Sequence, residues 1–270
     1  MQKKLNLKTL VILFVSLIVV FLFLAWVRIT TIHKLGQAYS NLPALQSDLK
    51  NTSVNFEKKP AIDLSAYQPY KSVNYAKLAK NISAAIVRVQ DGIKATPSIY
   101  INKDGSDPAF KYHITGLQEQ GIPVAVYAYA NATTKNQMIE EAKSFYERAK
   151  AYQPTSWWVD VESPTMKDLN GGVEAFRSEL EKLGAKNIGI YSRDDFLTEN
   201  NIDTSKFDGT WLAYYGQLND GSFTALNIKR SYQIQQYTDQ LKIDGYAGPI
   251  DHDRILSTAA YKKFFLNMKN

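Results

Sequence analysis

The sequence predicts an α/β protein, an irregular (β/α) TIM-like barrel preceded by one N-terminal transmembrane helix. From residue 61 onward, short apolar runs alternate with polar, helix-prone segments, and residues 9–27 form an uncharged stretch near the start. Strand and helix that alternate repeatedly in one domain favour a closed parallel barrel with its helices outside. The eight candidate strands are 61–64, 84–89, 123–129, 156–161, 188–191, 210–214, 232–236 and 248–251.

The uncharged stretch of residues 9–27 is long enough to span a bilayer as a helix. A secretory signal peptide is the alternative, but its apolar core is normally shorter and no small-x-small cleavage site follows here. Three lysines precede the stretch, which favours a cytoplasmic N-terminus over residues 1–8, although Arg28 and Lys34 follow it. The sequence therefore predicts a single-pass cell-membrane protein whose C-terminal domain is extracellular.

A polar segment separates the predicted anchor from the predicted barrel. Residues 28–60 lack a strand-like pattern, and Pro43 interrupts a weak helical stripe of leucines. Such a linker would reach roughly 50 Å as a helix and about 110 Å when extended. The predicted globular domain covers residues 61–270.

The net charge of the chain is concentrated before the barrel. The formal charge of +6 belongs to residues 1–60, and the remaining residues contain equal numbers of acids and bases. A neutral domain has no electrostatic footprint for nucleic acid. The chain has no cysteine and only three histidines, so neither a disulfide nor a cysteine-ligated metal is available, and little remains for a zinc site or a Ser-His-Asp triad. We expect no cofactor and no metal, with His113 on a helix surface and His252 at a strand end.

The segments between the strands change in character along the domain. Residues 135–151 and 172–183 have helical patterns that stop before Gly or Pro. The later spacers at 208–209, 219–221 and 244–245 are short and rich in Gly, Asn and Asp, so the last strands should lack full helices.

Polar residues fall at the carboxyl ends of these strands, where barrel enzymes keep their chemistry. A strand end in the core has no packing reason to be polar, so this convergence predicts an active site. These residues are Asp63, Arg88 to Asp91, Tyr127, Tyr129, Asp160, Glu162, Tyr191, Tyr214, Tyr215, Gln236 and Asp251.

The most informative of these strand ends carries two acids. Side chains alternate along a strand, so Asp160 and Glu162 point the same way, and Pro164 prevents the strand from continuing. Neighbouring carboxylates repel each other, which raises the pKa of one of them. One protonated and one ionised acid are what glycoside hydrolysis needs, and aromatic residues such as the two preceding tryptophans are typical of sugar sites. Two solvated acids at a surface strand end are the alternative interpretation.

The order of motifs over about residues 61–255 resembles the glycoside hydrolase family 25 lysozymes, which are N-acetylmuramidases. The matching segments are Ile62-Asp63-Leu64-Ser65-Ala66-Tyr67-Gln68, Ala85 to Gly92, Asp107-Pro108-Ala109-Phe110, Gly116 to Gly121, Tyr127-Ala128-Tyr129, Trp158 to Glu162, Thr210 to Tyr215, Gln235-Gln236-Tyr237 and Ile250-Asp251. Ala128 stands where the family usually has His, and Ala61 where it has Gly.

The resemblance implies hydrolysis of the β-1,4 bond between N-acetylmuramic acid and N-acetylglucosamine with retention. Glu162 would be the general acid/base. Asp160 would either orient the substrate's 2-acetamido group or stabilise the developing charge, and Asp63 and Asp251 would be further catalytic acids. The partner would be the glycan strands of peptidoglycan, reached by a domain that faces the cell wall. The candidate substrate contacts are Tyr67, Arg88, Tyr127, Tyr129, Trp158, Tyr191, Trp211, Tyr215 and Gln236.

Two other functions compete with this prediction. A chitinase-like barrel needs acids at positions 155 and 158, where this chain has Thr155 and Trp158. An inactive wall-binding module would keep the cleft without turnover, but the presence of all four acids argues against decay of the site. The sequence gives no oligomeric state.

Overall fold

The computed structural model describes residues 59–215, 228 and 230–266. The predicted cytoplasmic segment, the predicted anchor and nearly all of the predicted linker, residues 1–58, lie outside this part. Within it, no helix has the length and apolar character needed to cross a membrane. The predicted barrel, in contrast, is described almost completely.

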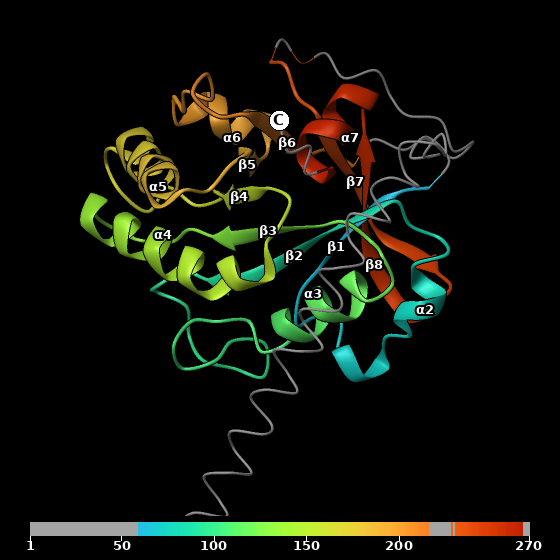
Figure 1. Ribbon diagram of the computed structural model, residues 1–270. Coiled ribbons are helices and arrows are strands. Elements are labelled where there is room, and N and C mark those ends of the chain that lie inside the picture. The colour runs from blue at the N-terminus through green and yellow to red at the C-terminus, as the bar shows by residue number, and fades with distance from the viewer. Residues whose placement is uncertain (1–58, 216–227, 229, 267–270) are drawn as a thin grey trace, which may run out of the picture. The chain divides into compact units, whose positions relative to one another are not determined.

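The strands form a closed eight-stranded barrel in which neighbours in sequence are neighbours in space (Figure 1). The first seven pair in parallel. The eighth is antiparallel to both of its neighbours, so the prediction of a wholly parallel barrel was wrong there. The strands are β1 (Ala61–Leu64), β2 (Ala84–Asp91), β3 (Val124–Tyr129), β4 (Trp157–Asp160), β5 (Ile188–Ser192), β6 (Gly209–Ala213), β7 (Ile234–Ile243) and β8 (Tyr246–Ile255).

A two-residue turn is the reason for the antiparallel strand. β7 ends at Ile243 and β8 begins at Tyr246, which leaves no chain for the crossover that a parallel pair requires. Gly245 has φ = 110°, a left-handed conformation that glycine adopts without strain. Because β8 runs antiparallel to β1, Asp251 pairs with Asp63 near the carboxyl end of β1.

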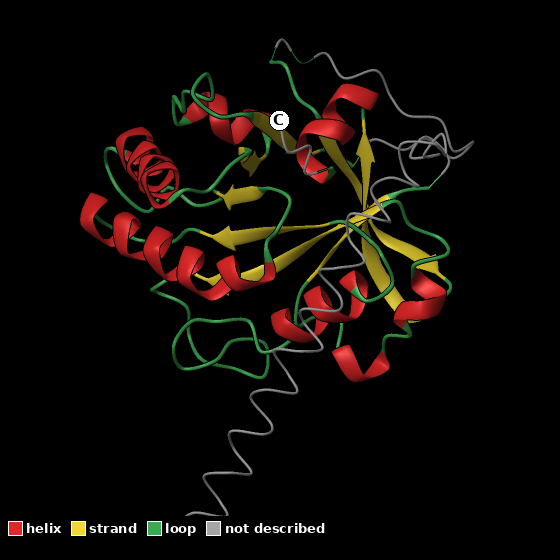
Figure 2. Cartoon of the chain, viewed as in Figure 1, coloured by secondary structure: helices red, strands yellow, loops and turns green. Residues whose placement is uncertain are grey.

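Helices cover the outside of the first part of the barrel (Figure 2). The two predicted helices are confirmed with small changes of boundary, since α4 passes into a short 3-10 helix, η2 (Lys150–Tyr152), and α5 starts three residues early. Thr134 caps α4 by accepting a hydrogen bond from the backbone N–H of Gln137. The helices are α2 (Tyr75–Leu78), α3 (Phe110–Gln118), α4 (Lys135–Ala149), α5 (Leu169–Leu183), α6 (Asp194–Glu199) and α7 (Thr258–Phe265), with η1 (Tyr70–Ser72) near the start.

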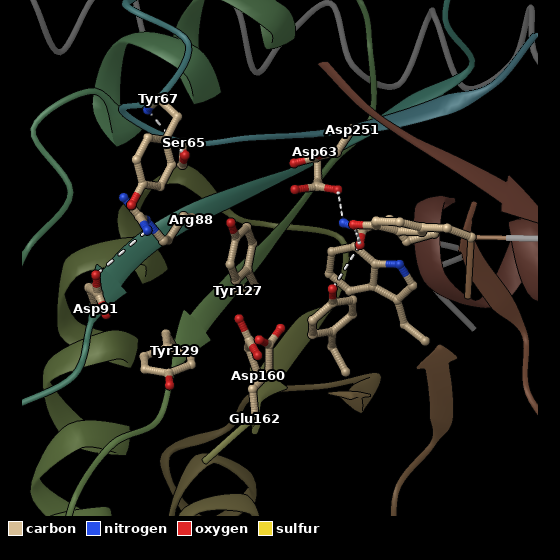
Figure 3. A pocket seen from close by; sticks show the side chains of 14 residues that line it. Asp63, Ser65, Tyr67, Arg88, Asp91, Tyr127, Tyr129, Asp160, Glu162 and Asp251 are labelled. Atoms are coloured by element: carbon tan, nitrogen blue, oxygen red, sulfur yellow. Dashed lines mark hydrogen bonds and ion pairs between the residues drawn. The ribbon is translucent and has the colours of Figure 1, made fainter. Parts of the chain in front are cut away.

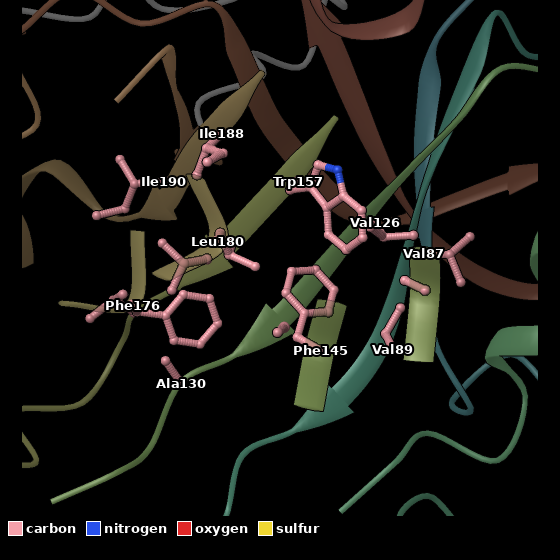
Figure 4. Close-up of a cluster of buried hydrophobic side chains, with 14 of the residues drawn as sticks. Val87, Val89, Val126, Ala130, Phe145, Trp157, Phe176, Leu180, Ile188 and Ile190 are labelled. Carbon is pink, nitrogen blue, oxygen red and sulfur yellow. The ribbon is translucent and has the colours of Figure 1, made fainter. Parts of the chain in front are cut away.

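The alternation of side chains along the strands creates two apolar layers. One lies between the barrel and its helices, where Phe145 of α4 meets Trp157 at 5.2 Å between ring centroids and Phe176 of α5 lies beside it (Figure 4). The other fills the barrel interior and contains Trp158 and Trp211. The tryptophan pair therefore divides between the two layers, one ring on each face of β4.

Gly189 makes room for the interior tryptophan. It is the cross-strand neighbour of Trp158, and a β-carbon at this position would overlap the indole ring. We expect Gly189→Ala to lower the free energy of unfolding by roughly 1–3 kcal/mol, measured by urea denaturation. Gly171→Ala is the control, because its added methyl meets only side-chain atoms of Asp168 and Lys135. Equal stability of Gly189→Ala and the unmodified protein would contradict this packing.

Candidate active site

A polar cleft of about 410 Å³ opens at the end of the barrel where β1–β7 have their carboxyl termini (Figure 3). All eight strands contribute a side chain to it, and four further residues come from the loops that follow strands. The lining residues are Asp63, Ser65, Tyr67, Arg88, Asp91, Tyr127, Tyr129, Asp160, Glu162, Tyr191, Trp211, Tyr215, Gln236 and Asp251.

Asp160 and Glu162 meet on one side of this cleft. Asp160 is the last residue of β4 and is buried, whereas Glu162 is exposed to the solvent of the cleft. Their side chains form a hydrogen bond, while one oxygen of Asp160 has no hydrogen-bond partner. Two carboxyl groups in such contact cannot both be ionised without a large cost, so the pair holds a proton.

Burial decides which acid of the pair holds this proton. Burial, together with the charge of Glu162, raises the pKa of Asp160 well above its usual range. Burial also raises the pKa of Glu162, but Arg193 and hydrogen bonds from Tyr191 and Asp160 oppose that shift. The proton therefore resides mainly on Asp160 in the free protein. The family resemblance instead names Glu162 as the general acid/base, which is the acid that would need the proton during the reaction.

A second acid pair lies across the cleft. Asp63 of β1 and Asp251 of β8 form a hydrogen bond, and Asp63 also accepts one from Nε2 of Gln236 at 2.7 Å. Burial is the main cause that raises the pKa of Asp63 well above normal and that of Asp251 to about 6. Gln236 in turn accepts hydrogen bonds from the hydroxyls of Tyr191 and Tyr215, which fixes its orientation.

Aromatic residues form the floor between the two acid pairs. The Trp211 ring lies 4.3 Å from Tyr191 and 5.9 Å from Tyr127, measured between centroids. Its indole N–H donates to Asp253 at 2.7 Å, a carboxyl that is completely buried beneath the cleft. The tryptophan is thereby held in one orientation.

Three sequence expectations fail here, those for Trp158, His113 and His252. Trp158 points to the same side of β4 as Asp160, but it lies one layer deeper, is completely buried and donates to Ser156 rather than reaching the cleft. It is therefore not a substrate contact. His113 is completely buried under the cleft rim rather than exposed on a helix surface. His252 is also buried, within β8 rather than at its end.

The other candidate catalytic and substrate-contact residues line one cleft, which the sequence could not establish, whereas Gln90 and Tyr214 of the polar strand ends do not line it. Sequence reasoning missed Ser65 as a lining residue and the structural parts played by Asp107 and Asp253. Asp107 belongs to a quoted motif, but nothing in its spacing revealed its long-range partners. Among the described residues, no group of three or more His, Asp or Glu could hold a metal ion.

Comparison with known proteins defines the class and then the family. The sequence profile of the Glycosyl hydrolases family 25 matches residues 62–246. GHIP, a glycosyl hydrolase 25 of Streptococcus pneumoniae, is 38% identical over 84% of this chain and 99% of its own, with a TM-score of 0.77. The catalytic domain of endolysin ply40 from bacteriophage P40 of Listeria monocytogenes is 25% identical over 77% and 97%, with a TM-score of 0.65.

A third structure shares the fold at lower identity. The autolysin LytC of Streptococcus pneumoniae, in complex with a synthetic peptidoglycan ligand, is 21% identical over 72% of this chain and 46% of its own, with a TM-score of 0.55. No curated protein matched the chain. The protein is a glycoside hydrolase. It belongs to glycosyl hydrolase family 25.

The raised pKa of Asp251 yields a pH-dependent prediction. Its folded pKa of about 6 exceeds the ordinary 3.8, so its contribution favours folding at low pH and is lost as the pH rises through 6. Asp251→Asn is neutral throughout and should therefore add roughly 1–2 kcal/mol more unfolding free energy at pH 7.5 than at pH 4. Thermal and urea unfolding at both pH values measure this difference. The exposed Asp244→Asn serves as the control, and an equal gain at both pH values would refute the burial of the Asp251 charge.

Proposed function

We propose that this hydrolase is a lysozyme, an N-acetylmuramidase that cleaves the β-1,4 bond between N-acetylmuramic acid and N-acetylglucosamine in peptidoglycan with retention. The observation that carries the proposal is the hydrogen-bonded pair of Asp160 and Glu162 in the polar cleft of a family 25 domain. The similarity of fold to the LytC autolysin, whose structure is in complex with a synthetic peptidoglycan ligand, supports the choice of substrate.

Glu162 is the general acid/base in this proposal, because it is the member of the pair that reaches the solvent of the cleft. It protonates the glycosidic oxygen as the bond to C1 breaks. It then removes a proton from the water that attacks C1. The aromatic floor and the polar side chains opposite the pair hold the sugar rings during both steps.

The hydrogen bond between the two acids supports a role for Asp160 in orienting the substrate's 2-acetamido group rather than in attacking C1. Retaining enzymes that use a carboxylate nucleophile keep their two carboxyl groups about 5–5.5 Å apart, on opposite faces of the sugar. Asp160 and Glu162 are in hydrogen-bond contact, so Asp160 is badly placed for that attack. Asp160 lines the cleft and instead accepts the N–H of the substrate's 2-acetamido group, whose carbonyl oxygen attacks C1. Attack by the acetamido oxygen and then by water inverts C1 twice, which gives retention.

Substrate binding also places the proton correctly. A hydrogen bond from the acetamido N–H favours the ionised form of Asp160, and the bound sugar excludes water around Glu162. Both effects move the shared proton from Asp160 to Glu162, where the leaving oxygen needs it. The free protein thus stores the proton on the acid that the substrate subsequently ionises.

Substitution of the two acids tests this proposal. Glu162→Gln should lower kcat on purified peptidoglycan by roughly 10²–10⁴-fold, because the amide can neither donate nor retrieve the proton. Asp160→Asn should also be slow, and its pH profile should move because the pair no longer shares a proton. Circular dichroism of both variants confirms the fold. Near-normal lysis by Glu162→Gln would refute the assignment, and lysis absent from the unmodified protein would favour an inactive wall-binding module.

The location of the enzyme is a further part of the proposal. Residues 9–27 are uncharged and follow three lysines, which supports a single-pass anchor with residues 61–270 outside the cell, facing the wall. Hydrolysis would then be limited to wall within reach of residues 28–60.

Protease treatment of intact, wall-stripped cells tests this topology. It should remove the 61–270 domain and leave a small membrane-embedded fragment. Protection of the domain would reverse the orientation, and enzyme recovered from the medium with an N-terminus after residue 25 would make the segment a signal peptide.

A further inference from the structure

A single buried carboxylate outside the cleft connects several parts of its rim. Asp107 has no exposed surface and does not line the cleft. One of its oxygens accepts the backbone N–H of Ala66 at 2.8 Å and Nε of Arg88 at 2.9 Å. The other accepts the backbone N–H of Ala109 at 2.8 Å, just before α3. Asp107 thus joins the loop after β1, the end of β2 and the start of α3.

Arg88 connects Asp107 to residues that line the cleft. Its guanidinium lies 5.2 Å from the ring centroid of Tyr67 and donates from Nη2 to the backbone oxygen of Tyr100. The Tyr100 ring packs against Tyr67 with 4.5 Å between centroids. Nη1 lies 3.7 Å from Asp91, another lining residue. The Arg88 cation therefore contacts two lining side chains, Tyr67 and Asp91, and the backbone of Tyr100 at the rim.

The loop after β1 is fixed from a second side by a neutral histidine. Nε2 of His113 lies 3.1 Å from the backbone oxygen of Ser65, which can only accept, so this nitrogen carries the proton. Nδ1 then accepts from the Tyr75 hydroxyl at 3.0 Å. Burial lowers the pKa of His113, which keeps the ring neutral. These hydrogen bonds hold the loop after β1 in place on this side. The buried carboxylate of Asp107 connects the same loop to Arg88.

We propose that Asp107 is a positioning residue for glycan binding, which acts by holding the charge of Arg88 and the Ser65–Tyr67 rim at fixed places in the cleft. This inference rests on the proposed function, since it assigns a part of the glycan site. Asn cannot replace the carboxylate, because its amide nitrogen would face one of the three donors that Asp107 satisfies, and Arg88 would lose its closest counter-charge.

Displacement of Arg88 should also change the pKa of Asp160 in the acid pair. The groups that act on Asp160 are Glu162 on its own segment, Arg88 and Asp91 from β2, the rings of Tyr127 and Tyr129 from β3, and Tyr191 from β5. Arg88 is the cation among them and lowers the pKa of Asp160. If Arg88 moves away, the pKa of Asp160 rises, so the limb of the pH profile that reports the pair should move to higher pH.

The test compares steady-state kinetics of the full-length protein and its variants on soluble peptidoglycan fragments. Asp107→Asn should raise KM by roughly tenfold or more and leave kcat at its optimum pH within about threefold. The pH limb should move upward by about half a unit or more. Arg88→Lys keeps the charge but cannot span Asp107 and Tyr100 together, so it should shift KM in the same direction.

The matched control is Asp104→Asn, in the same loop. Asp104 is exposed, pairs with Arg148 and contacts Ser106, so its loss loosens the loop without touching Arg88. It should leave both KM and the pH profile unchanged. Asp107→Asn combined with Arg88→Lys should raise KM little more than either change alone, because both changes disrupt the same contact between Asp107 and Arg88.

Additive effects, an unshifted pH profile, or equal losses in Asp104→Asn would overturn the proposal. If Asp107→Asn does not fold, the KM and pH profile of Arg88→Lys decide: normal values for both would overturn it. Binding of the same fragments to Glu162→Gln, with and without the Asp107 change, gives a readout that does not depend on turnover. Weaker binding only in the double variant supports the inference even if the cleaved bond differs from the one proposed.

Discussion

The hydrogen bond between Asp160 and Glu162 is the interaction around which the cleft is arranged. A closed barrel places the last residue of β4 where water is largely excluded, so Asp160 is stable there only if it is protonated or paired. Glu162, two residues later, accepts that proton's hydrogen bond while it stays in contact with solvent. The pair therefore holds a proton that a ligand can redistribute, which is the requirement for acid catalysis followed by base catalysis at one site.

The rest of the cleft fixes the surroundings of this pair. Asp63 and Asp251 form a second proton-sharing pair because the last strand runs antiparallel and brings Asp251 opposite β1. Gln236 and two tyrosine hydroxyls orient that pair. Arg88 provides the positive charge near Asp160, and the buried Asp107 holds Arg88 in place. These groups sit on strands or on loops tied down by buried hydrogen bonds, so the charges that act on the acids are fixed before a substrate arrives.

Sequence periodicity predicted what depends on local geometry. It gave the eight strands, the helices α4 and α5, and a common direction for Asp160 and Glu162. It could not predict how deeply a side chain lies in the barrel. Trp158 points to the same side of β4 as Asp160 but is buried in the barrel interior beneath the cleft. The antiparallel β8 had a signal in Asp244-Gly245, a dipeptide typical of a hairpin turn, which the preference for a parallel barrel outweighed. Asp107 and Asp253 could not be recognised, since their partners lie far away in the sequence.

The identity of the new reducing end tests the central claim most directly. Purified peptidoglycan is digested with the enzyme, and the products are reduced and analysed by mass spectrometry. Cleavage of the N-acetylmuramic acid to N-acetylglucosamine bond by Glu162, as proposed here, predicts fragments that end in reduced N-acetylmuramic acid and that are missing from the Glu162→Gln digest. Fragments that end in reduced N-acetylglucosamine, or the same fragments from Glu162→Gln, would contradict the account.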